Sequence, residues 1–582
     1  MIRDADPQHI SALARDLKLP TWQARLLAAR GIATTEQAHK FLFPALADLH
    51  PPSRMMGLPQ AVDRLRAAVE RGETVLIYGD YDVDGTTAIV ILKTALELCG
   101  GKVDHHVPHR IREGYGMRDE VIERAHERGI RLIISVDTGI RAYAAAETAA
   151  RCGLDLIVTD HHLPHSDGVP KALAVVNPNQ PGCEYPCKSL CGAGVAFKIA
   201  QALLAESGRE RLLPSFLKIV AIATIADAVP LIGENRVFTK LGLEGLRRPV
   251  NAGLRALLSN CQLDGSRPLT AGDIAFRVAP RLNAAGRMDI AERVIRLFTE
   301  KDAGQAAEMA MQLDQLNGDR QNEEQRILQE IYEKIESSPE LKDAYCIVVD
   351  GAGWHRGVIG ICATRVVERY HRPALVFSCE DGEAHGSGRS IAPFHLLQAL
   401  ESCPELFTRF GGHSHAVGCA LPVECIPELR SRLDAHARQK LTPADFVPVL
   451  DYDADVALDQ LTHDFWAALQ RMEPFGSGNP TPVFVARDAK LIQPPRVMKD
   501  KHLKLRVVPG NPNSNGGRFQ RAHDVVGWRM AERAAQDPLL AGDVLNLAFT
   551  VDYNRHPDFG GVQLNLIEFA RAATPQAATA AP

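Results

Sequence analysis

The 582-residue sequence predicts an α/β protein with three parts: a doubly wound, mostly parallel sheet, a second α/β lobe joined to it by a long helix, and a C-terminal β-barrel. Strand and helix patterns alternate between residues 58 and 230. A highly charged stretch with helical spacing covers residues 302–340, and short β-like runs rich in Gly and Pro follow residue 448. These three observations predict the fold class.

Length and composition limit the class of protein that the chain can be. The chain is too long for one hydrophobic core, so we expect several domains. No apolar run approaches the roughly 20 residues of a membrane span, and the N-terminal residues lack a secretory pattern. Twelve cysteines without a disulfide framework suit reduced thiols in the cytoplasm. A net charge of −5 gives no global sign of nucleic-acid binding, so any polyanion site must be a local patch or contain metal.

The first half of the chain alternates regularly after a small helical leader, which we place at residues 1–57. Apolar, β-branched runs predict buried strands, and amphipathic stretches between them predict helices. The strands are 74–78, 131–136, 154–159 and 172–176, and the helices are 59–71, 86–99, 118–128 and 141–151. The segment from 211 to 300 is helical and is expected to cap or extend the sheet. The first α/β domain is thus predicted over 58–300.

The second half changes character twice. A partly exposed bridging helix is expected at 301–342, because charged residues recur there with helical spacing. A second α/β lobe is expected at 343–447, and a barrel at 448–571 with strands at 483–486, 503–508, 525–528 and 545–551. The low-complexity tail, 572–582, is expected to be disordered.

Carboxylates gather at the ends of the predicted strands. Asp80, Asp82 and Asp84 occupy alternate positions after the first strand, so neighbours in this series can face one point. Asp137 follows the next predicted strand, Asp160-His161-His162 follows the third, and Asp227 ends an apolar helix. In a parallel sheet these strand ends meet at one edge.

Carboxylates with imidazole favour a pair of Mn²⁺ or Mg²⁺ ions, which activate a water and stabilise the leaving oxygen of a phosphoester. A helix cap, or a histidine satisfied within the core, remains the alternative for each residue alone. Four coincidences at strand and helix ends disfavour that alternative for the set. A structural zinc at Cys183, Cys187 and Cys191 is disfavoured by their spacing.

The motifs at these positions resemble those of the DHH phosphoesterase superfamily, and within it the bacterial RecJ family of single-strand-specific exonucleases. The superfamily resemblance rests on Asp80-Tyr-Asp-Val-Asp-Gly85, Asp137-Thr-Gly139, Asp160-His-His162 and Asp227. Five further stretches narrow it: Ser189-Leu-Cys-Gly-Ala-Gly-Val-Ala-Phe-Lys198, Pro280-Arg-Leu-Asn-Ala-Ala-Gly-Arg287, Gly353-Trp-His-Arg-Gly-Val-Ile-Gly360, Gly411-Gly-His-Ser-His-Ala-Val-Gly418 and Glu473-Pro-Phe-Gly-Ser-Gly-Asn-Pro480.

The resemblance implies roles for individual residues of the first domain, which would be a DHH domain. The implied ligands of two Mn²⁺ or Mg²⁺ ions are Asp82, Asp84, Asp137, His161 and Asp227, with Asp137 bridging. Asp80 would orient its neighbours, and His162 would face the scissile phosphate as hydrogen-bond donor or acid.

The second lobe resembles the DHHA1 domain, which implies a pocket for the 5′-terminal phosphate of a strand. The candidates for holding that phosphate are Arg281, Ser387 and Arg389, with Arg287, His355 and His413 as further contacts. The alternatives are inter-lobe salt bridges for the arginines and turns that need a positive φ for the glycines of the two histidine motifs.

The predicted barrel carries a local positive charge. Residues 481–530 hold ten Lys or Arg against three Asp. The basic side chains we single out are Lys499, Lys501, Lys504, Arg506, Arg518, Arg521 and Arg529, with Phe484, Phe519 and Trp528 available to stack on bases. This combination is typical of barrels that hold single strands, and the resemblance implies an OB-fold. A solvated basic face is the alternative.

Together these patterns predict a 5′-to-3′ exonuclease that digests single-stranded DNA to mononucleotides. The alternatives are a small-nucleotide phosphodiesterase or phosphatase of the same superfamily, and a non-catalytic DNA-binding scaffold. The resemblance implies a single-strand-binding protein and a helicase as partners in recombination and repair. We expect a cytoplasmic monomer without membrane contact.

Overall fold

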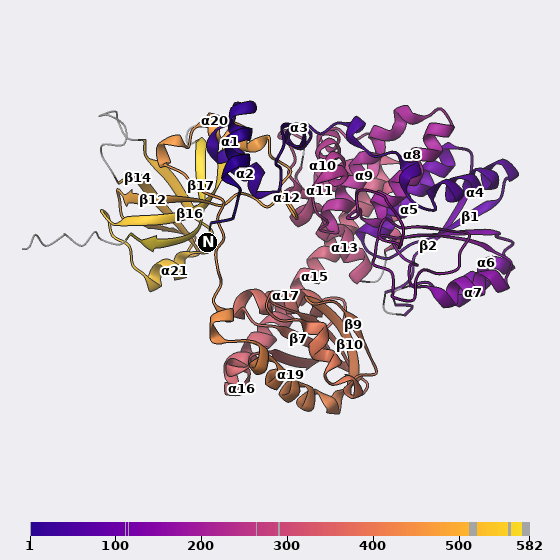
Figure 1. Cartoon of the computed structure of the whole chain (residues 1–582). Helices are drawn as coiled ribbons and strands as arrows, with labels where there is room; N and C mark the ends of the chain where they lie inside the picture. Colours follow the sequence, from indigo (N-terminus) through magenta and orange to yellow (C-terminus); the bar gives the residue numbers. More distant parts are fainter. Residues whose placement is uncertain are drawn as a thin grey trace, which may run out of the picture.

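The computed structural model describes residues 2–110, 112–114, 116–263, 265–288, 291–510, 521–556 and 560–572. Arg518, Phe519 and residues 573–582 of the predicted tail lie outside them. Figure 1 shows three bodies, with helix α15 (Ala303–Ser337) leading from the first α/β domain to the second lobe. Among the described helices, none combines the length and hydropathy needed to cross a membrane.

The first domain is built on a five-stranded sheet in which every described strand pair is parallel, in the order β2-β1-β3-β4-β5. Its strands are β1 (Thr74–Tyr78), β2 (Lys102–His106), β3 (Leu132–Val136), β4 (Asp155–Thr159) and β5 (Ala174–Val176). The β-branched runs in β1, β3 and β4 are buried, as expected for strands covered on both faces.

Helices cover both faces of this sheet, which confirms the doubly wound prediction. One apolar core joins alternate strand residues to α4 (Leu58–Arg71), α5 (Val83–Leu98) and α8 (Gly192–Glu206). A second core on the other face contains α6 (Asp119–Glu127) and α7 (Tyr143–Arg151). The predicted helical extension consists of α9 (Leu213–Ala226), α10 (Gly233–Leu246), α11 (Ala252–Asn260), α12 (Ala271–Asp273), a π-helical turn (Ile274–Val278), α13 (Ala279–Arg287) and α14 (Glu292–Thr299).

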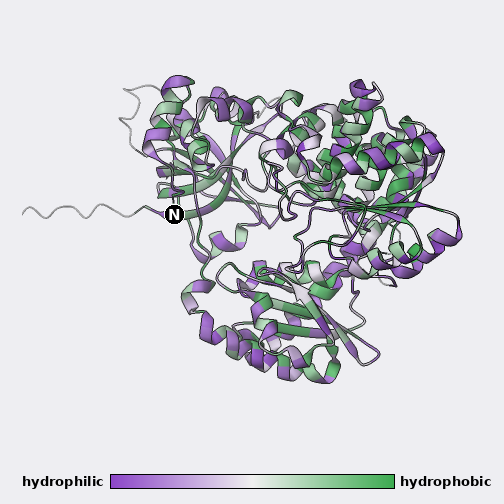
Figure 2. Ribbon diagram, turned by 45° about the vertical axis from the view of Figure 1, so that its right-hand side comes forward, coloured by the Kyte–Doolittle hydropathy of each residue, from purple (hydrophilic) through white to green (hydrophobic). Residues whose placement is uncertain are grey.

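The second lobe has its own core on a mixed sheet, in the order β6-β7-β8-β10-β9. The strands are β6 (Ile347–Ala352), β7 (Ala374–Glu380), β8 (Glu383–Arg389), β9 (Arg409–Gly412) and β10 (Ala416–Pro422). Helices α16 (Pro339–Asp343), α17 (Ile359–Tyr370), α18 (Leu396–Glu401) and α19 (Ile426–Lys440) pack around it. In Figure 2 the strands of this lobe are largely green and the outer helices largely purple, as an amphipathic arrangement requires.

The C-terminal body is a closed barrel, as predicted. Its strands follow the order β11-β12-β16-β17-β15-β14-β13, and an additional pairing of β12 with β14 closes the sheet. They are β11 (Ala454–Asp455), β12 (Phe484–Leu491), β13 (Arg496–Met498), β14 (His502–Pro509), β15 (His523–Gly527), β16 (Val544–Asn554) and β17 (Gly561–Arg571), with helices α20 (His463–Gln470) and α21 (Ala531–Gln536).

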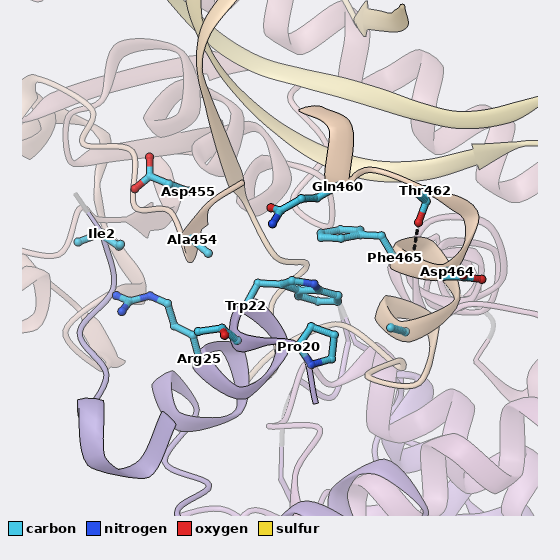
Figure 3. A pocket seen from close by; sticks show the side chains of 12 residues that line it. Ile2, Pro20, Trp22, Arg25, Ala454, Asp455, Gln460, Thr462, Asp464 and Phe465 are labelled. Atoms are coloured by element: carbon cyan, nitrogen blue, oxygen red, sulfur yellow. Dashed lines mark hydrogen bonds between the residues drawn. The ribbon is translucent and has the colours of Figure 1, made fainter. Parts of the chain in front are cut away.

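The helical leader packs against this barrel. Helices α1 (Pro7–Asp16), α2 (Thr21–Ala29) and α3 (Thr35–Leu42) contribute residues to the core of the barrel. The Trp22 ring stacks on Phe465 with 4.1 Å between centroids, and Figure 3 shows both rings in a pocket beside Arg25. The N-terminal helices and the barrel therefore share one core although they stand at opposite ends of the sequence.

Candidate metal centre

The predicted carboxylates meet at the edge of the first sheet where β1 and β3 lie side by side. This is the switch point of a 2-1-3-4-5 strand order, where α/β sheets bind ligands. Asp80 stands two residues after β1, Asp137 directly follows β3, and Asp160 directly follows β4. Asp227 reaches the same place from the C-terminal end of α9.

Three groups of side chains here could each hold an ion, and within each group the ligand atoms lie within 4.8 Å of one another. The groups are Asp80, Asp82 and Asp137; Asp84, His161 and Asp227; and Asp137, His161 and His162. His161 Nε2 lies 3.2 Å from Asp137 Oδ1, 3.7 Å from Asp84 Oδ2 and 3.8 Å from Asp227 Oδ2. The structure thus brings all five predicted ligands together, with Asp137 shared between groups. Asp80, for which the resemblance implied an orienting role, lies within the first of these groups and could also hold an ion.

Backbone geometry fixes these side chains. Asp82 is the N-cap of α5 and accepts a hydrogen bond from Gly85 N at 3.0 Å, so the capping interpretation and the ligand interpretation both fit it. Asp84 accepts hydrogen bonds from the first two amides of α8, Gly192 N at 2.6 Å and Ala193 N at 2.8 Å. Asp137 has a φ of 59°, a left-handed conformation that non-glycine residues adopt rarely and mostly at functional sites.

Buried carboxyl groups here lack partners for part of their oxygen atoms. Asp80 Oδ1, Asp137 Oδ1 and Asp227 Oδ2 are buried and have no hydrogen-bond partner. Burial and the charges of neighbouring aspartates raise the pKa of Asp80 and Asp227 to about 8 each, and that of Asp137 well above its usual range. Bound cations would remove this repulsion, and an oxygen-rich donor set with one imidazole fits Mn²⁺ or Mg²⁺.

His162 stands beside the ligands and is held by Asp160. The buried Asp160 carboxylate lies 2.7 Å from His162 Nδ1 and also accepts from the amides of His161, His162 and Ile140. Burial opposes the charged imidazole, but the hydrogen bond and charge of Asp160 prevail and raise the pKa of His162 to about 9. Asp160, to which the sequence assigned no separate role, thus orients His162 and favours its protonated form.

A cationic cavity of about 960 Å³ lies between the first domain and the second lobe, beside the metal-binding turn. Tyr81, between two of the metal-binding aspartates, lines one end. The remaining lining includes Arg110, Arg112, Glu113, Arg118, Arg287, Arg356, Gly360, His385, Ser387, Arg389, Arg409, Phe410, Gly411 and Gly418.

Three arginines that line the cavity, Arg110, Arg287 and Arg389, have little negative charge near them. Burial, with the charges of Arg110, Arg320 and Arg389, lowers the pKa of Arg287 to about 10, and its Nη1 donates only to Gly357 O at 3.1 Å. Arg389 Nη1 donates to Ser387 Oγ at 3.2 Å, and the Arg110 guanidinium lies 4.9 Å from the Tyr81 ring centroid. No described carboxylate lies within ion-pair distance of these three arginines, so the cavity suits an anion.

Three predicted phosphate contacts, Arg281, His355 and His413, do not line this cavity. Arg281 Nε pairs with Asp314 at 2.7 Å, whereas Arg287, predicted alongside it, does line the cavity. His355 Nδ1 accepts from Gly357 N within a turn, and His413 is exposed between β9 and β10. Trp528 lies in the barrel, 58% exposed and edge-on to His502. Arg110 escaped the sequence reasoning because its loop carries no motif.

Metal-ligating groups among the described residues include none of Cys183, Cys187 and Cys191, and all twelve cysteines are free thiols.

Comparison with known proteins gives one consistent family. The model of the DHH family N-terminal domain matches residues 74–224, the DHHA1 domain 343–439 and the RecJ OB domain 452–568. The single-stranded-DNA-specific exonuclease RecJ of Bacillus subtilis is 40% identical over 87% of this chain, which spans 64% of that relative. RecJ of Dickeya dadantii is 36% identical over 94% of this chain and 96% of its own length.

A solved structure points to the same family. The crystal structure of Thermus thermophilus RecJ in complex with Mn²⁺ superimposes with a TM-score of 0.82 and 28% identity, over 98% of this chain and 79% of that one. With the three domain models in order and near full-length similarity to curated members, the chain belongs to the RecJ family of single-stranded-DNA-specific exonucleases.

Proposed function

We propose that this chain is a metal-dependent exonuclease that digests single-stranded DNA from the 5′ end and releases mononucleotides. One observation carries the proposal: the cavity that begins at the metal-binding turn contains uncompensated arginines. A centre for phosphodiester cleavage next to an anion pocket is what cleavage at a phosphorylated strand end requires. The names of the RecJ relatives support the substrate class.

The candidate ligands form one group for each of two ions. Asp80, Asp82 and Asp137 would hold one Mn²⁺ or Mg²⁺, and Asp84, His161, Asp227 and Asp137 the other. When bound, such ions supply an activated water and neutralise charge on the phosphate and the leaving oxygen. His162, protonated through Asp160, donates a hydrogen bond to the phosphate, which stabilises the charge that builds up there.

The end pocket would determine the direction of digestion. Arg110, Arg287, Ser387 and Arg389 would hold the 5′-terminal phosphate, and the fixed distance to the metal centre then presents the first phosphodiester. The remainder of the strand would pass to the barrel, where exposed Trp528 and the basic side chains offer stacking and phosphate contacts. Such a module has no use in a small-nucleotide phosphodiesterase.

The cleavage test uses a single strand and the matching duplex, both labelled at the 5′ end, with Mn²⁺. We expect mononucleotides from the single strand only. Asp137→Asn removes a carboxylate that belongs to one ligand group and lies 3.2 Å from His161 of the other, a loss worth several kcal/mol, so cleavage should fall about 1,000-fold while strand binding persists. Equal digestion of the duplex would refute strand selectivity, and a wild type that binds without cutting under any divalent ion would favour the scaffold.

The end pocket has a separate test. Arg389→Ala should raise KM for a 5′-phosphorylated strand about 10-fold or more, because it removes a charge-assisted contact, and should change KM for a 5′-hydroxyl strand little. Arg281→Ala is the matched control, since Arg281 pairs with Asp314 outside the cavity. A similar loss of 5′-phosphate preference in both variants would contradict the assignment.

We also propose a cytoplasmic monomer that works with a single-strand-binding protein and a helicase in recombination and repair. Twelve free thiols support a reducing compartment. Light scattering of the purified chain tests the monomer, and co-purification with either partner tests the assembly.

A further inference from the structure

The cationic cavity continues past the proposed end pocket into a second group of basic residues, Arg356, His385 and Arg409, called here the outer group. On β8, His385 precedes Ser387 by two residues, so both side chains lie on the same face of the sheet. Across the sheet Ser387 pairs with Gly418 and Gly418 with Gly411, whereas His385 pairs with Ala420 and Ala420 with Arg409. The outer group therefore forms the next row along the strand, about 6.6 Å beyond Ser387.

The sheet surface beside Ser387, in the same row, is open. At Gly411 and at Gly418 no atom lies within 4 Å of the position a Cβ would take. Both glycines line the cavity, so the sheet surface there is bare backbone on which a ligand can lie.

The two arginines of the outer group carry positive charge without an ion-pair partner among the described residues, whereas His385 lies against Glu383. Burial and the charge of Arg409 lower the pKa of Arg356, and burial and the charge of Arg356 lower that of His385. Glu383 lies 3.0 Å from His385, and Glu380 acts on the group from farther away. No described carboxylate is within ion-pair distance of Arg356 or Arg409.

A strand with a 5′-monophosphate ends at Ser387 and Arg389, so nothing of it reaches the outer group. Building on the proposed function, we propose that Arg356, His385 and Arg409 bind the β- and γ-phosphates of a 5′-triphosphorylated strand, which the chain accepts as a substrate. The two additional phosphates extend a strand end by about the length of one row. The chemical class is thus a single-stranded polydeoxynucleotide that carries a 5′-triphosphate.

The reaction itself is unchanged. A water oxygen bonds to the phosphorus between the first two nucleotides, the bond from that phosphorus to the 3′-oxygen breaks, and the 3′-oxygen takes a proton. The first product is then a nucleoside 5′-triphosphate, and the remaining strand carries a 5′-monophosphate.

The kinetic test compares one oligodeoxynucleotide sequence carrying either a 5′-monophosphate or a 5′-triphosphate, with Mn²⁺. We expect digestion of both, a KM for the triphosphate strand no higher than for the monophosphate strand, and a nucleoside triphosphate as its first product by mass spectrometry. The double variant Arg356→Gln/Arg409→Gln should raise KM for the triphosphate strand about 10-fold and leave the monophosphate strand within about twofold. Arg112→Gln, which removes a charge elsewhere in the cavity, should not separate the two substrates.

A binding test without divalent ions separates this inference from the proposed function. Calorimetry should show that tripolyphosphate binds the wild type at least about 10-fold more tightly than inorganic phosphate, and that the double variant loses this preference. Digestion of the monophosphate strand alone, or equal effects of the double variant on both strands, would overturn the outer group as a triphosphate site. Preferential tripolyphosphate binding without any digestion would overturn the nuclease and leave the site standing.

Discussion

Asp84 ties the metal centre to a helix that begins more than a hundred residues later. Both of its carboxylate oxygens accept hydrogen bonds from the first amides of α8, at Gly192 and Ala193. The positive end of the helix thus compensates part of the negative charge that the aspartates concentrate. This contact also brings the first residue of α8, Gly192, close to Asp137. A Cβ on Gly192 would lie 2.5 Å from Asp137 Cβ and 2.7 Å from Asp137 Oδ1, so only glycine fits.

Gly192→Ala should therefore displace Asp137 and weaken both ligand groups. We expect Mn²⁺-dependent activity or apparent Mn²⁺ affinity to fall about 10- to 100-fold, as measured by metal titration of the cleavage rate. Gly194→Ala is the matched control on the same helix, because its Cβ would meet Leu190 at an ordinary 3.4 Å. Equal behaviour of the two variants would mean that α8 does not position Asp137.

Sequence reasoning reached the ligands but not their support. The alternate spacing of Asp80, Asp82 and Asp84 follows from strand geometry, so their convergence could be predicted. The left-handed φ of Asp137 and the contact of Gly192 depend on tertiary packing, which no local pattern encodes. Arg281 and Arg287 are six residues apart on α13, and only the surrounding helices decide that one pairs with Asp314 while the other enters the cavity.

At the level of elements, prediction succeeded where local composition was unambiguous. Strands β1, β3 and β4 are apolar and β-branched, and each predicted boundary lies within one residue of the observed one. β2 was missed because Lys102-Val-Asp-His-His106 lacks an apolar run; it is an edge strand that pairs only with β1 in the described sheet and remains half-exposed. The bridging helix was predicted from its charge and spacing, and it is 35 residues long.

Gly318 lies near the middle of this bridging helix without an evident steric need for glycine. No atom lies within 4 Å of where its Cβ would stand, and its φ is not positive. Gly318→Ala should stabilise the helix by about 0.5–1 kcal/mol and raise the melting temperature by about 2 °C.

Thermal unfolding followed by circular dichroism measures this change. Gly304→Ala is the control, because its Cβ would lie 3.2 Å from the Asp302 oxygen that caps the helix, so no gain is expected there. A lower melting temperature for Gly318→Ala would show that the helix uses the flexibility of glycine at this point.

At the scale of the whole molecule, the stretch Glu473-Pro-Phe-Gly-Ser-Gly-Asn-Pro480 is where three parts of the chain meet. Arg30, at the end of α2, donates to Asn479 Oδ1 at 2.6 Å and to Pro480 O at 2.8 Å. Leu231 of the first domain donates its amide to Ser477 O at 2.7 Å. The resemblance singled out this motif without giving it a task, and the structure makes it the junction that sets the barrel against the catalytic domain.

Arg236 of α10 is the central contact of that junction. Its side chain is 1% exposed, its guanidinium lies 3.7 Å from the Phe41 ring centroid, and it donates to Phe41 O at 2.5 Å. Its Nη2 also donates to Met472 O and Glu473 O, each at 2.9 Å. One side chain thus joins a backbone carbonyl of the leader to those of the segment leading into the barrel, where Met472 O also accepts from Asn479 Nδ2 at 2.9 Å and Glu473 O from Lys240 Nζ.

Arg236→Met should therefore loosen the barrel from the first domain, at a cost of about 3 kcal/mol for the lost hydrogen bonds to Phe41 O, Met472 O and Glu473 O. We expect a lower melting temperature, faster proteolysis between the second lobe and the barrel, and weaker binding of long single strands, which must contact both bodies. Cleavage of a dinucleotide, which reaches only the metal centre, should change little. Lys240→Met, one turn further along α10, removes a single 3.3 Å hydrogen bond to Glu473 O and should have a much smaller effect. If both variants weaken long and short substrates alike, the junction supports folding of the catalytic domain rather than the placement of the barrel.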